Sequence, residues 1–113
     1  MGTRLGFMEY VAEQAALGDR LTYRRMFGEY AVYVDGKVVA FACDNSLFIK
    51  PSQAAAVLAP GLPQRPPYPG AKGYPVADEL LDDSPALRTL ILETAALMPE
   101  PKPRRPAAGR RRR

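Results

Sequence analysis

Apolar runs rich in β-branched and aromatic residues, separated by short polar turns, fill residues 24–50 and predict β-strands whose two faces are both fairly apolar. An aromatic, β-rich segment runs to Val34, turns at Asp35-Gly36 and resumes at Lys37, and Asp-Gly suits a type I′ turn because both residues tolerate positive φ. A two-residue turn predicts cross-strand pairs Val34 with Lys37, Val32 with Val39 and Tyr30 with Phe41, and places Ala31, Tyr33, Val38 and Ala40 on the opposite face. A third strand, of open register, is predicted over Leu47 to Lys50 after the polar turn Asp44-Asn45-Ser46.

Helical periodicity marks both ends of the folded region. Residues 5–17 have one apolar helix face, and Gly18 is a natural stop. Residues 52–58 predict a short helix with Ser52 as N-cap, which ends before Pro60-Gly61. The last helix begins with Ser84 as cap and Pro85 in its first turn, and its apolar positions are Leu87, Leu90, Ile91, Thr94 and Leu97 or Met98.

Between these helices, residues 60–76 are rich in proline and glycine, which predicts a loop with one short edge strand around Tyr74 to Val76. Carboxylates then precede the last helix, where they complement the positive end of its dipole. These carboxylates are Asp78, Glu79, Asp82 and Asp83. They could also bind a cation or activate water, but their position before the helix is enough to explain their presence.

Charge is divided unevenly along the 113 residues, whose net charge is +4. Residues 99–113 hold seven basic side chains and one acidic one, whereas residues 1–98 hold nine basic and eleven acidic ones. We therefore expect one slightly acidic domain over 1–98 and a disordered Pro/Arg-rich basic tail over 99–113. No run of about 18 apolar residues occurs, so a cytoplasmic protein without membrane attachment is expected.

The residue composition limits the catalytic and metal sites that the chain can form. The chain has no histidine and one cysteine, Cys43, which removes Ser-His-Asp, Cys-His and ordinary structural zinc sites. Glu9 and Glu13 have the spacing of an ordinary solvated helix face, and Lys72 lies among glycines without the order of a phosphate-binding loop. We expect no catalytic residue, metal site or cofactor, and an enzyme using Asp, Glu, Lys or Tyr is the weakest alternative.

Residues 24–50 also carry a family resemblance, through Arg25, Met26, Phe27, Gly28, Tyr30, Tyr33, Asp35, Gly36, Leu47 and Lys50. This combination resembles the N-terminal domain of the TfoX/Sxy family. The resemblance implies an α+β fold, an antiparallel sheet packed against N- and C-terminal helices in two layers, similar to secretion chaperones. It also implies an association with regulation of natural competence, and it carries no catalytic residues. The same aromatics superficially resemble an RNA-recognition motif, but Glu29 stands where that motif needs an aromatic, so core packing is the stronger interpretation.

Two functions follow as hypotheses. The first is a non-enzymatic regulatory or protein-interaction domain with a protein partner, a homodimer being one option. The second is nucleic-acid binding through the basic tail, by Lys102, Arg104, Arg105, Arg110, Arg111, Arg112 and Arg113.

Overall fold

The computed structural model describes residues 2–99, and these form an α+β domain. Its central sheet is antiparallel, with strands in the order β1 (Leu21–Met26), β2 (Glu29–Val34), β3 (Lys37–Cys43) and β4 (Ser46–Ile49). The helices are α1 (Leu5–Ala15), α2 (Gln53–Leu58) and α3 (Ser84–Leu97), with short 3-10 turns η1 (Gly18–Arg20) and η2 (Asp78–Leu80). The predicted fold class is therefore confirmed.

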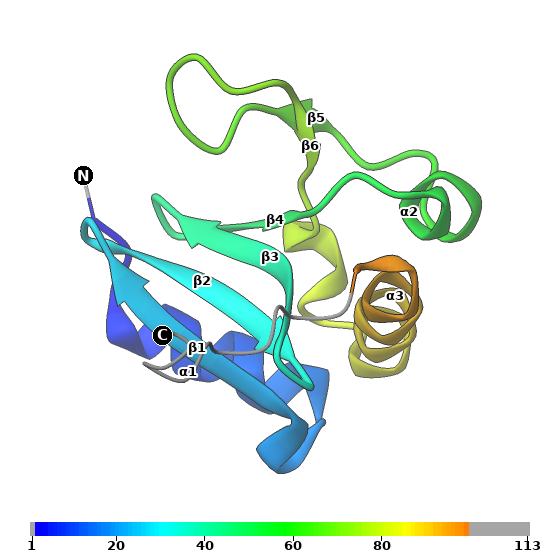
Figure 1. Ribbon diagram of the computed structural model, residues 1–113, viewed down its shortest axis with the longest axis horizontal. Coiled ribbons are helices and arrows are strands. Elements are labelled where there is room, and N and C mark those ends of the chain that lie inside the picture. The colour runs from blue at the N-terminus through cyan, green and yellow to red at the C-terminus, as the bar shows by residue number, and fades with distance from the viewer. Residues whose placement is uncertain (1, 100–113) are drawn as a thin grey trace, which may run out of the picture.

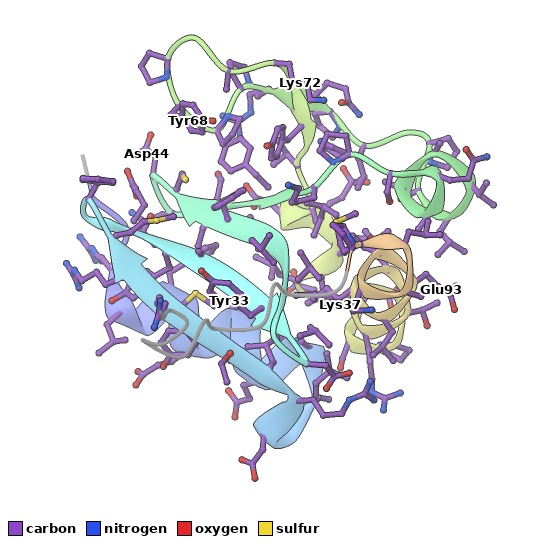
Figure 2. All side chains as sticks on the ribbon, viewed as in Figure 1. Tyr33, Lys37, Asp44, Tyr68, Lys72 and Glu93 are labelled. Carbon is purple, nitrogen blue, oxygen red and sulfur yellow. The ribbon has the colours of Figure 1, made fainter. Side chains whose placement is uncertain are left out.

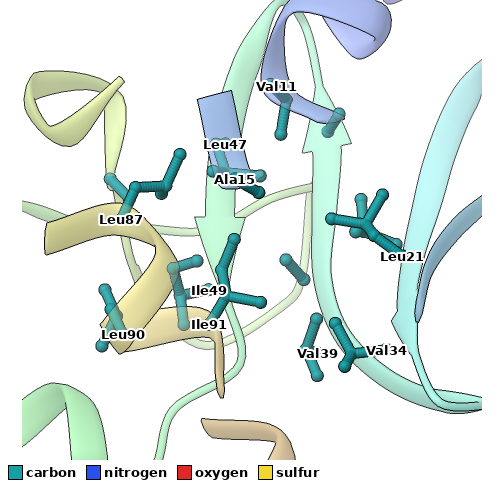
Figure 3. Packing of buried hydrophobic residues seen from close by; sticks show 14 of the residues in the cluster. Val11, Ala15, Leu21, Val34, Val39, Leu47, Ile49, Leu87, Leu90 and Ile91 are labelled. Carbon is teal, nitrogen blue, oxygen red and sulfur yellow. The ribbon is translucent and has the colours of Figure 1, made fainter. Parts of the chain in front are cut away.

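Helices α1 and α3 cover one face of the sheet, which we call the inner face, and α2 packs beside α3 (Figure 1). The main core lies between this face and the helices, and Leu47, Ile49, Leu87 and Ile91 are among its fully buried members (Figure 3). On α1 the buried positions are Met8, Val11 and Ala15, whereas Leu5, an expected member of the apolar face, is 48% exposed.

The opposite, outer face is partly covered by an arm that follows α2. Its two short strands, β5 (Gln64–Arg65) and β6 (Tyr74–Pro75), pair with each other, and Val76 bridges to Phe48 of β4 (Figure 1). The edge strand expected around Tyr74 to Val76 is present, and β5 is an addition to it. A second small cluster forms where the arm meets the sheet, from Cys43, Phe48, Tyr74 and Val76 with Phe41 against it.

The predicted hairpin is correct at its turn but wrong farther along. Val34 pairs with Lys37 as expected, whereas Val32 pairs with Ala40 and Tyr30 with Ala42 because the register shifts between Val32 and Tyr33. The shift leaves Val39 as an extra residue, and Val39 and Ala40 are both fully buried in the main core. As a result Phe41 lies on the outer face rather than opposite Tyr30.

Two further expectations need correction. The sequence before Val34 forms two strands, not one, because the chain reverses at Phe27-Gly28 between β1 and β2. The cap of α3 is Asp83, whose carboxylate accepts a hydrogen bond from the Ala86 N–H at 3.2 Å. Ser84 instead begins the helix, and its hydroxyl donates to the Gln14 carbonyl at 2.5 Å, which joins α3 to α1.

Candidate functional site

Three two-residue turns connect the four strands of the sheet, and both residues of each turn have positive φ. This is the backbone of type I′ turns, which favour Asn, Asp and Gly. Asp35-Gly36 and Asp44-Asn45 follow that preference, with φ of 52° and 84° and of 52° and 57°. Phe27-Gly28 does not, because Phe27 adopts φ of 52° at the position where the other turns have aspartate.

The Phe27 side chain is also 99% exposed, so the turn carries an aromatic ring that contributes almost nothing to the core. A large side chain in the left-handed region costs free energy, and such strain tends to occur at functional sites. Core packing was the expected role of the aromatics in this segment. That expectation holds for Tyr30, which is 4% exposed, and is wrong for Phe27.

Beside this turn lies an apolar hollow of about 400 Å³, here called the outer groove. Its lining comes from the β1–β2 turn, strands β2 and β3, and the arm: Met26, Phe27, Glu29, Tyr30, Phe41, Cys43, Pro67 and Tyr68. Met26 and Tyr68 are 40% and 57% exposed. Figure 2 shows Tyr68 on the arm, above the β3–β4 turn that carries Asp44. The groove is therefore open to solvent and rimmed by exposed apolar side chains.

A polar frame fixes the end of the groove near the N-terminus. The Glu29 carboxylate accepts hydrogen bonds from the Thr3 hydroxyl at 2.6 Å and from the Asp44 N–H at 3.0 Å. The Thr3 N–H in turn donates to the Gly28 carbonyl at 2.9 Å. These contacts hold the β1–β2 and β3–β4 turns together, so the backbone that presents Phe27 is well supported.

Arg25 and Tyr30 lie side by side on the inner face of the β1–β2 pair. The Arg25 guanidinium donates to the Tyr30 hydroxyl at 2.8 Å and lies 5.4 Å from the centre of its ring. Tyr23 meets the same ring edge to face, with ring centres 5.6 Å apart. This stack stiffens the end of the hairpin next to the Phe27 turn.

Cys43 lines the outer groove but is buried, and burial raises the pKa of its thiol from the ordinary 9.0 to about 11, with smaller contributions from Glu29 and Asp44. The thiol is therefore protonated at neutral pH and a poor nucleophile. Within residues 2–99 no group of three or more Cys, Asp or Glu side chains is arranged to hold a metal ion.

Three of the four acidic residues before α3 have separate structural partners. Asp78 accepts hydrogen bonds from the Ser46 hydroxyl at 2.7 Å and the Leu47 N–H at 2.8 Å, so it ties η2 to β4. Asp82 accepts one from the Tyr10 hydroxyl at 3.0 Å, which raises the pKa of Tyr10, and Asp83 caps α3.

Seven of the ten residues that carried the family resemblance lie at the two ends of one hairpin. Arg25, Met26, Phe27, Gly28 and Tyr30 gather at the β1–β2 turn, which forms one side of the outer groove. Asp35 and Gly36 form the turn at the other end of the hairpin, where Asp35 pairs with Arg20 at 2.8 Å.

The proposed tail site, Lys102, Arg104, Arg105 and Arg110 to Arg113, lies outside the described residues.

The exposure of Phe27 was not predicted from the sequence. The available signal was the Phe-Gly pair between two segments of alternating apolar residues, which fits a two-residue turn.

A second, smaller apolar surface lies where α2 meets α3. It includes Val57, Leu58 and Leu97, which are 65%, 47% and 53% exposed, around a hollow of about 300 Å³. These residues have ordinary helical surroundings, and none of the three has a positive φ. The outer groove is therefore the stronger candidate, because it alone combines an exposed aromatic with backbone strain.

Fold and site together define a small α+β domain that presents an apolar groove on the outer face of its sheet. The family model of the TfoX N-terminal domain matches residues 13–97, and the chain belongs to this family. It is 44% identical over 105 residues to an uncharacterised 12.7 kDa protein in the trpE 5′ region of Spirochaeta aurantia, an alignment that covers 93% of this chain and 91% of that protein. No solved structure matches the chain, so the likeness to secretion chaperones stays a prediction.

None of the helices in residues 2–99 is long and apolar enough to cross a membrane.

Proposed function

We propose that this protein is a non-enzymatic regulatory domain that binds a partner protein through the outer groove. The observation that carries the proposal is Phe27, a fully exposed aromatic ring held in the left-handed backbone region at the groove rim. Folding gains nothing from this placement, whereas an aromatic anchor next to an apolar hollow is typical of the centre of a protein interface.

The groove suits an apolar side chain better than a polar small molecule. Its lining is dominated by methionine, phenylalanine, tyrosine and proline, and its one carboxylate, Glu29, is already occupied by Thr3 and the Asp44 N–H. Cys43 is the one thiol among the lining residues, and it is neutral. These features favour docking over chemistry, because a reaction would need a positioned acid, base or activated nucleophile.

The test compares three immobilised proteins as baits in cell extract: wild type, Phe27→Asn and Val57→Gln. Phe27→Asn removes the ring from a turn position that asparagine favours, whereas Val57→Gln removes an exposed apolar side chain from the other surface. We expect a partner retained by wild type and Val57→Gln and lost by Phe27→Asn. Equal retention by all three proteins would show that the groove is not the binding site.

Self-association is checked separately, because a homodimer is one form that the partner can take. Light scattering of wild type and Phe27→Asn over a range of concentrations distinguishes a groove-dependent dimer from a monomer that binds another protein. A wild-type monomer at high concentration that also captures no partner would count against the proposal.

Family membership sets the expected biological context, regulation of natural competence or of transcription. The measurement is transformation frequency in a host that encodes this protein, after replacement of the gene by its Phe27→Asn variant. An unchanged frequency would separate the domain's binding function from competence.

Nucleic-acid binding through the basic tail is a second candidate, favoured by the net charge of +6 on residues 99–113. If about six phosphates are neutralised, log K falls against log salt with a slope of about −5, which is roughly a thousandfold loss over a fourfold rise in salt. Such binding would be largely independent of sequence. Deletion of residues 99–113 without a change in DNA or RNA affinity would eliminate this candidate.

A further inference from the structure

β1 lies at one margin of the four-stranded sheet (Figure 1), and no strand of residues 2–99 pairs with its outward edge. In an antiparallel pair, alternate residues direct their N–H and C=O groups at the neighbouring strand. The Asp35 N–H donates to the Arg20 carbonyl at 2.9 Å, so Arg20 directs its backbone groups at β2. Every second residue after it, namely Thr22, Arg24 and Met26, does the same. Tyr23 and Arg25 therefore direct their backbone groups away from β2.

Within residues 2–99, no hydrogen bond from outside the sheet reaches the backbone of Tyr23 or Arg25. The opposite margin is different, because β4 is met by Val76 and by the Ala77 N–H, which donates to the Leu47 carbonyl at 2.8 Å. β1 also has no proline and no register shift, two devices that commonly block an edge. It is thus a straight edge strand that a further strand can extend.

Two arginines give this edge a positive charge. Arg24 and Arg25 are neighbours, so their side chains lie on opposite faces of the sheet. Neither is within ion-pair distance of a carboxylate of the described residues, and the partner of Arg25 is the uncharged Tyr30 hydroxyl. An added strand with carboxylates at two adjacent positions would meet one guanidinium on each face.

The same charges disfavour a second copy of this chain as the added strand. Antiparallel pairing of β1 with its own copy brings four arginines into one two-stranded ribbon, and like charges that face each other across strands are destabilising. Charge complementarity therefore selects a different, acidic segment.

We propose that the free edge of β1 binds an extended acidic segment of a partner protein by strand addition. Adjacent carboxylates of that segment face Arg24 and Arg25, and an apolar residue next to them, which precedes them in an antiparallel segment and follows them in a parallel one, lies beside Met26 at the outer groove. This inference rests on the proposed function and adds the chemistry of the partner and its mode of binding.

The test uses a capped peptide of about eight residues. Its two adjacent glutamates have a leucine on each side, so that one leucine meets Met26 in either strand direction, and its other residues are valine and threonine. Binding to the full chain is followed by calorimetry. In two further versions of the peptide the backbone N–H groups are methylated, in one version at the odd-numbered residues and in the other at the even-numbered residues. Because one set faces β1 and the other faces solvent, one methylated peptide should lose binding and the other should retain it. Equal binding by both would overturn strand addition.

Charge is tested by exchange. Arg24→Glu should weaken the glutamate peptide about tenfold and strengthen a peptide with lysines at the two glutamate positions. The matched control is Lys72→Glu, the same charge change on the arm away from β1 (Figure 2), which should leave both affinities unchanged. An equal loss of peptide affinity in the two variants would show a general charge effect and contradict the proposed site. The proposal would also be contradicted if a single-stranded oligonucleotide displaced the peptide while both methylated peptides still bound.

The two proposals fail separately. If Phe27→Asn abolishes partner capture but the peptide does not bind β1, the groove function stands and strand addition is wrong. If the peptide binds as expected but Phe27→Asn changes no partner interaction, the edge is a binding site and the role of the groove is wrong.

Discussion

Replacement of Phe27 by asparagine should make the domain more stable, although it removes a large apolar side chain. Most losses of this kind weaken a protein because they open a cavity in its core. Phe27 is not in the core, since its side chain is 99% exposed and its backbone has φ of 52° at the first position of a type I′ turn. Asparagine is among the residues that this position favours.

The size of the effect follows from two terms. A phenylalanine buries at most about 200 Å², so a ring that is 99% exposed buries about 2 Å², worth less than about 0.1 kcal/mol. The left-handed backbone region costs a side chain such as phenylalanine about 1–2 kcal/mol, and asparagine avoids much of this cost. We therefore expect a gain of about 1 kcal/mol, or about 4–8 °C in Tm for a domain of this size.

Thermal and urea unfolding of wild type and Phe27→Asn measure the gain. Asp44→Asn is the matched control, because Asp44 occupies the same turn position with φ of 52° and is already a residue that this position favours. Its stability should change by no more than about 0.5 kcal/mol. A lower free energy of unfolding for Phe27→Asn would refute the reasoning, since it would mean that the ring makes stabilising contacts in solution.

Three further outcomes test other parts of the structure. Asp78→Ala should cost about 1–3 kcal/mol in urea unfolding, because the Leu47 N–H loses its acceptor at the junction of η2 and β4, whereas Asp78→Asn should cost less. Arg20 lowers the pKa of Asp35 below its ordinary 3.8, so the ionised pair stabilises the fold above that pH and the contribution is lost as pH falls through the lower value. Asp35→Asn should therefore destabilise the fold at pH 7, and urea unfolding should show the difference from wild type shrinking as pH falls below 3.8. Because the pKa of the Cys43 thiol is about 11 instead of 9.0, its thiolate fraction at pH 8 is about a hundredfold lower than that of a free thiol, and alkylation should be slow until urea unfolds the chain.

Local sequence rules predicted those parts of the fold that local sequence determines. The Asp35-Gly36 turn, the strand after Asn45 and the helix that contains Leu87 and Ile91 follow from turn chemistry and periodicity, and all three are present. The pairing of Val32 with Ala40 could not be obtained in this way. It depends on the burial of both Val39 and Ala40 against the helices, which is a tertiary effect.

The candidate site was harder to predict for the same reason. Phe41 lines the outer groove because the register shift turns it to the outer face, and Tyr68 approaches it from a proline-rich loop whose course is not encoded by periodicity. Phe27 was hidden by its chemistry, since a phenylalanine among strand residues is normally assigned to the core. The structure shows that Phe27 occupies a turn and that its ring is 99% exposed.

Phe27 and the open edge of β1 have a common physical consequence. The first has a cost in backbone strain and an exposed ring, and the second directs backbone groups away from the sheet beside two arginines without ion pairs in the described region. Both lie at the same end of one hairpin, which the Tyr30 stack and the Glu29 frame hold rigid. A rigid site binds with less loss of conformational entropy than a flexible one. A partner that pairs with the edge and covers the ring would therefore use both features in one binding event, and Phe27→Asn combined with Arg24→Glu should weaken partner binding more than either change alone.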